Sequence, residues 1–170
     1  IWDNWSVGWG ALLVITAFTG FAASYAFYLV GNSFVVKGDE QYLKGAYREA
    51  LDYYERAIRF GSRQTSGAWT NRGNCLRHLG MLNEARQSHE IALKIDDKNE
   101  VAWANLGAVL LLMNDLPGAI DAYNHSLELK PNYVVAINNK GVALANMDDL
   151  VSANRLFKKA IEIRPRYKAA

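Results

Sequence analysis

One pattern recurs along the chain at an interval of 34 residues: GNCLRHLGMLNEARQSHEIAL at residues 73–93, GAVLLLMNDLPGAIDAYNHSL at residues 107–127 and GVALANMDDLVSANRLFKKAI at residues 141–161. Each copy begins with glycine, has alanine twelve positions later, and has a second small residue seven positions after that. Small side chains at such spacings let two helices cross closely. The pattern therefore predicts helix pairs that stack along the chain.

A large side chain recurs between the small ones, where it can fill the space that they leave. These positions are Tyr54, His89, Tyr123 and Phe157, each followed four residues later by an aliphatic residue: Ile58, Leu93, Leu127 and Ile161. Tyr54 belongs to a weaker copy, whose glycine, Gly38, lies one residue earlier than the period requires.

The copy around residue 107 resembles the tetratricopeptide-repeat (TPR) family most closely. Its matches to the family pattern are Trp103, Leu106 and Gly107 in the first helix and Ala119, Tyr123 and Pro131 in the second. The resemblance covers residues 31–167 and implies an all-α solenoid of four helix-turn-helix repeats, at 31–65, 66–99, 100–133 and 134–167. The first repeat is degenerate, because Phe34 stands in place of tryptophan and Gln41 in place of leucine.

The N-terminal segment, residues 1–30, has a different character. Residues 7–30 contain no charged side chain, and this run exceeds the roughly 20 residues with which a helix crosses about 30 Å of hydrocarbon. We therefore predict one transmembrane helix at about residues 7–30. Aromatic residues suited to the two membrane interfaces flank it: Trp2, Trp5, Trp9, Tyr25 and Tyr28.

The charges around this run predict its orientation. Asp3 precedes it, and Lys37, Lys44 and Arg48 follow it. Basic residues favour the cytoplasmic side, so we expect a single-pass integral membrane protein with its N-terminus outside or lumenal and its repeats cytoplasmic or stromal, possibly in a thylakoid. Thr16, Gly20 and Ser24 share one helix face and predict packing against another membrane helix. A lipid-facing helix with incidental small residues is the alternative.

The TPR resemblance implies a concave face, lined by the first helix of each repeat, that binds extended polypeptide. Lining positions are expected two residues before, one before, one after and four after each glycine. Asparagine stands two residues before the glycine in three repeats, at Asn71, Asn105 and Asn139. A carboxamide both donates and accepts, so we predict a ladder that holds a peptide backbone, as in family members with bound peptides. The alternative is that these asparagines only cap or solvate their helices. Further predicted lining residues are Asn74, Arg77, Asn138, Ala108 and Leu112.

Motifs for catalysis or for a cofactor are missing from the sequence. The three histidines, His78, His89 and His125, belong to no metal-binding pattern, and Cys75 is the single cysteine. The phosphate-binding and serine-nucleophile motifs are not found either. The formal net charge of +2 is spread along the chain, which argues against nucleic acid as a partner. We expect no cofactor and no enzymatic activity, and the basic residues needed to clamp a chaperone's C-terminal carboxylate are also missing.

Together these observations predict a membrane-anchored scaffold that binds other proteins. The order of segments resembles the membrane-anchored TPR assembly factors of photosystem I, and the resemblance implies an assembly or docking factor. A permanent accessory or linker subunit of a large membrane complex is the alternative, and a bacterial envelope anchor is a third. Expected partners are polypeptides in the groove, the lipid bilayer and neighbouring membrane helices. The last repeat face, around Leu156 and Ile163, is expected to be covered by further chain or by a partner.

Overall fold

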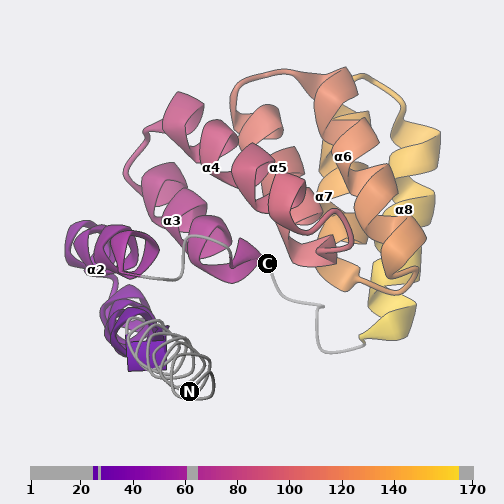
Figure 1. Ribbon diagram of the computed structural model, residues 1–170. Helices are drawn as coiled ribbons and strands as arrows, with labels where there is room; N and C mark the ends of the chain where they lie inside the picture. The colour runs from indigo at the N-terminus through magenta and orange to yellow at the C-terminus, as the bar shows by residue number, and fades with distance from the viewer. Residues whose placement is uncertain (1–24, 27, 61–64, 165–170) are drawn as a thin grey trace, which may run out of the picture.

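A computed structural model describes residues 25, 26, 28–60 and 65–164 of the chain (Figure 1). These residues form α-helices joined by short turns. Residues 28–43 are helical, and seven labelled helices follow: α2 (Tyr47–Arg59), α3 (Ser66–His78), α4 (Leu82–Ile95), α5 (Glu100–Leu112), α6 (Leu116–Leu129), α7 (Val134–Asn146) and α8 (Leu150–Ile163). The predicted all-α solenoid is thereby confirmed for this part of the chain.

Consecutive helices pack against one another from α2 to α8, and the stack progresses in one direction across the molecule (Figure 1). The closest pairs are α3 with α4, α5 with α6, and α7 with α8. Contacts also join α3 to α5 and α5 to α7, whereas among the described residues no comparable contact joins α4 to α6 or α6 to α8. The helices α3, α5 and α7 therefore crowd along the inner side of the stack, and α4, α6 and α8 spread along its outer side.

Each helix pair is held by a large ring that lies against a glycine. A Cβ atom built on Gly107 would come within 2.7 Å of Tyr123 Cε1, and one on Gly73 within 2.6 Å of the His89 ring. Gly38 with Tyr54 and Gly141 with Phe157 repeat this arrangement. Because only glycine leaves room for the ring, the recurring glycine and the recurring large residue form one packing unit, as predicted.

The turn inside each repeat uses a left-handed residue, at Gly45, Gly80, Asn114 and Asp148, with φ between 62° and 76°. Glycine, asparagine and aspartate tolerate this conformation best. The following helix is capped in two cases: Asp115 Oδ1 accepts from Gly118 N, and Asp149 Oδ1 accepts from Ser152 N. Asp115 and Asp149 therefore cap the N-termini of α6 and α8.

The predicted membrane location is corrected by the structure. In the part of the chain that it describes, none of the helices combines the length and apolar character needed to cross a bilayer. The prediction of a single-pass membrane protein with cytoplasmic or stromal repeats is contradicted by this finding. The prediction relied on the uncharged run at residues 7–30. The labelled helices that follow this run are 13 or 14 residues long and pack as pairs.

Most of the N-terminal segment lies outside the described residues. This applies to Trp2, Trp5 and Trp9 and to the predicted packing face of Thr16, Gly20 and Ser24. Tyr25 and Tyr28 are described, and their exposed rings stack on each other with centroids 6.5 Å apart.

Candidate binding groove and its family

The three asparagines of the predicted ladder lie one on each inner helix. Asn71 is on α3, Asn105 on α5 and Asn139 on α7, and all three are half-buried. Asn71 Nδ2 donates to Asp39 Oδ1 at 3.1 Å, which links the second repeat to the first. The inner helices therefore present these amides at successive levels of the stack, and their role in binding a peptide stays a prediction.

A pocket of about 190 Å³ opens near Asn71, at the first repeat's end of this inner side. Its lining combines a carboxylate, two phenols and two amides: Asp39, Tyr42, Tyr54, Asn71 and Asn74, with Leu43 at the edge. Tyr54 Oη donates to Asp39 Oδ1 at 2.6 Å. Burial, followed by this hydrogen bond, raises the pKa of Tyr54 far above its ordinary value, so the phenol stays protonated.

Aromatic rings extend the pocket toward the turn of the first repeat. Tyr42 Oη lies 3.0 Å from His78 Nε2, and the Tyr47 ring stacks on the His78 ring with a centroid distance of 4.1 Å. Burial raises the pKa of Tyr42, although nearby Arg77 opposes the shift. The sequence prediction missed Asp39 and Tyr42, because the first repeat departs from the family pattern. Counting one and four residues on from Gly38 would have identified both.

Two predicted lining residues carry buried polar atoms without a hydrogen-bond partner among the described residues: Oδ1 of Asn74 and Nε of Arg77. The guanidinium of Arg77 reaches His78 Nε2 at 3.2 Å and has no carboxylate within 4.0 Å in the described part of the chain. Unpaired buried polar atoms cost free energy. The inner side of the second repeat therefore contains polar atoms whose burial no described partner offsets.

The other predicted lining residues continue this side of the stack toward the last repeat. Ala108 and Asn138 are half-buried, and Leu112 is 57% exposed at the end of α5. These three residues are therefore at least partly accessible, and their role in binding a peptide stays a prediction.

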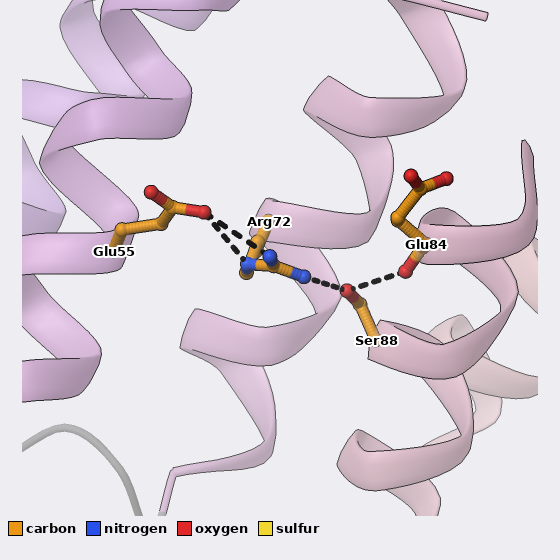
Figure 2. A network of polar contacts seen from close by, with 4 residues as sticks. All are labelled: Glu55, Arg72, Glu84 and Ser88. Carbon is orange, nitrogen blue, oxygen red and sulfur yellow. Dashed lines mark hydrogen bonds and ion pairs between the residues drawn. The ribbon is translucent and has the colours of Figure 1, made fainter. Parts of the chain in front are cut away.

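The residues directly before Gly73 and Gly141, which were predicted to line this side, contact the outer helices instead. Arg72 precedes Gly73 and reaches between α2 and α4, where Nη2 lies 3.1 Å from Glu55 Oε1 and Nη1 lies 2.6 Å from Ser88 Oγ (Figure 2). Lys140 precedes Gly141 and donates to Asn124 on α6.

Two buried groups, the Cys75 thiol and the His89 imidazole, have pKa values shifted so that both are uncharged at neutral pH. Burial, followed by the Asp39 charge, raises the pKa of the Cys75 thiol to about 12, so it stays protonated at neutral pH. Burial, followed by Arg77, lowers the pKa of His89 to about 4, and neither ring nitrogen has a partner among these residues. Within the same residues, no cluster of three or more potential metal ligands occurs.

Comparisons with known proteins agree with this architecture. A tetratricopeptide-repeat family model matches residues 64–132. No curated protein matches the chain. Among solved structures, MamA is similar with a TM-score of 0.71 at 20% identity, covering 81% of this chain and 80% of MamA.

Two further solved structures extend the comparison. YrrB, described as a TPR protein with an unusual peptide-binding site, has a TM-score of 0.68 at 22% identity, covering 89% of this chain and 82% of its own. The first TPR of Spaghetti (RPAP3), bound to an HSP90 peptide, has a TM-score of 0.67 at 22% identity, with coverages of 71% and 94%. Identities this low establish the fold alone. The family match adds that residues 64–132 are similar to tetratricopeptide repeats.

Proposed function

We propose that the chain is a non-catalytic scaffold whose inner helices bind an extended segment of another protein. The observation that carries this proposal is the series of half-buried amides, Asn71, Asn105 and Asn139, one on each of the inner helices α3, α5 and α7, with the Asp39 pocket beside the first of them. A carboxamide both donates and accepts hydrogen bonds, so these three side chains would hold the backbone of an extended polypeptide.

The similar structures support this class of ligand. YrrB has a peptide-binding site, and the TPR of Spaghetti holds a peptide of HSP90. An assembly or docking role in a multi-subunit complex is the finer form of the proposal. The resemblance to photosystem I assembly factors depended on the predicted membrane span, and none of the comparisons adds support for that complex.

The test uses peptides selected from a random-sequence display library on the full chain. Their affinities are then measured for the wild type and for a variant in which Asn71, Asn105 and Asn139 are all alanine. Losing three hydrogen bonds should weaken binding by roughly 10- to 1,000-fold, at about 0.5–1.5 kcal/mol for each bond. Asn83→Ala, at an exposed site on the outer helix α4, is the matched control and should bind normally.

The proposal fails if the selected peptides bind the triple variant as tightly as the wild type. It also fails if no peptide is selected, or if binding is lost equally in the Asn83 control. Helicity measured by circular dichroism separates loss of binding from loss of fold.

A further inference from the structure

A second groove lies on the outer side of the last two repeats, between α6 and α8, with α7 as its floor. Its volume is about 450 Å³. Its walls carry three cations, Lys140, Arg155 and Lys159, and three aliphatic side chains, Ile120, Leu144 and Leu156. No carboxylate lines it. This groove is separate from the inner side to which Asn71 and Arg77 belong.

The corresponding position in the first two repeats, between α2 and α4, is occupied by side chains that bond to one another. Arg72 is the counterpart of Lys140, because each directly precedes the glycine of its repeat. Figure 2 shows Arg72 between Glu55 and Ser88, with Nε and Nη2 lying 3.3 and 3.1 Å from Glu55 Oε1. Ser88 Oγ in turn donates to the Glu84 carbonyl oxygen at 2.8 Å. Glu55 therefore neutralises the charge of Arg72, and Nε, Nη1 and Nη2 of Arg72 all donate hydrogen bonds.

The same network is incomplete in the last repeats. Asn124 holds the place of Glu55, and Leu156 holds the place of Ser88. Lys140 therefore donates to a neutral amide oxygen instead of a carboxylate. Lys159 has only a backbone oxygen, that of Pro131, at 3.3 Å. Within the described part of the chain, none of the three groove cations forms an ion pair.

We infer that this outer groove binds an acidic segment of a partner protein, in which a glutamate or aspartate lies beside an aliphatic residue. The partner's carboxylate pairs with Lys140 and Arg155, as Glu55 does with Arg72. The aliphatic residue covers Leu144 and Leu156. A small anion by itself would leave this apolar lining exposed, so the groove fits polypeptide better than free phosphate.

The outer face of α8 gives such a segment room to continue. It shares Arg155 and Lys159 with the groove and adds Lys158, Asn154 and two aliphatic residues, Leu150 and Val151, which are 64% and 80% exposed. One carboxylate, Glu162, also lines it. Three cations beside one carboxylate leave this surface basic, so an acidic, amphipathic segment complements both its charge and its aliphatic side chains.

The experiment titrates the isotope-labelled full chain with a synthetic peptide of alternating glutamate and leucine, and follows amide shifts by NMR. A peptide of alternating glutamine and leucine tests the need for charge. Asn124→Glu supplies the missing carboxylate from within the chain, and Lys140→Met removes the central cation. Asn83→Glu adds the same charge at an exposed site on α4 and is the matched control.

We expect saturable shifts at the amides of α6, α7 and α8 with the glutamate peptide. Binding should weaken by at least about tenfold for the glutamine peptide and for both groove variants, and should be unchanged in Asn83→Glu. The inference is overturned by equal binding to Asn124→Glu, by shifts confined to the inner helices, or by no saturable binding. Such a result leaves the inner-side proposal intact, because the asparagine variant tests that side separately.

Discussion

Replacing His89 with phenylalanine should stabilise the protein, and the gain should grow as the solution is acidified. His89 is fully buried against Gly73, and both of its nitrogens lack partners among the described residues. Phe157 occupies the same place in its own repeat. A Cβ atom built on Gly141 would lie 2.6 Å from the Phe157 ring, the same distance as between Gly73 and the His89 ring, so the repeat accommodates a phenyl ring there. Removing unpaired buried polar atoms should raise the free energy of unfolding by about 1–3 kcal/mol at neutral pH.

The pH dependence follows from where His89 gains its proton. Burial, followed by Arg77, lowers its pKa from 6.5 to about 4 in the folded chain. Between these values the unfolded chain binds a proton that the folded chain does not, so stability falls as the pH falls. From about pH 7.5 to about pH 5, this one group should cost the wild type about 2 kcal/mol of unfolding free energy.

Urea unfolding followed by circular dichroism, for both proteins at both pH values, measures this effect. All other ionisable groups are common to both proteins, so the widening of the difference in unfolding free energy isolates His89. If both proteins lose stability in parallel on acidification, His89 is already solvated or hydrogen-bonded in the folded chain, and the reasoning is wrong.

Two further substitutions test the packing and the outer network. Gly107→Ala should destabilise the chain by about 1–3 kcal/mol, because its Cβ would lie 2.7 Å from the fully buried Tyr123 ring. The control Gly67→Ala lies on α3, where the new Cβ would meet no atom of the described residues within 4 Å apart from its chain neighbours and the backbone of its own helix. It should instead stabilise by about 0.5–1 kcal/mol, and equal thermal melts for the two variants would refute the packing unit. In a double-mutant cycle, Glu55→Gln and Arg72→Met should show a coupling of about 0.5–1 kcal/mol that shrinks in high salt, because Glu55 is 48% exposed. Additive effects would show that the network of Figure 2 contributes nothing.

The repeat interval by itself determined the helix pairs and their core. The recurring glycine and large side chain lie 16 residues apart, and any chain folded as antiparallel helices at this period brings them together. The left-handed turn residues at 45, 80, 114 and 148 are also visible as a periodic choice of glycine, asparagine or aspartate once the helices are known. These features are local or strictly periodic, so a single sequence contains them.

The membrane location was predicted from a local pattern, an uncharged run that meets the length rule for a span. Most of that run lies outside the described residues. The described helices, including residues 28–43, do not meet the requirement for crossing a bilayer.

Only the tertiary structure decided which polar groups find partners. Arg72 and Lys140 occupy the same position in their repeats, yet one meets a carboxylate and the other a neutral amide. Asp39 joins Tyr54 and Asn71 across three helices, although neither partner is near it in sequence. Hydrogen bonds and ion pairs depend on separations of about 3 Å between elements distant in the chain, and a repeat period fixes the position of a backbone without fixing what each side chain meets.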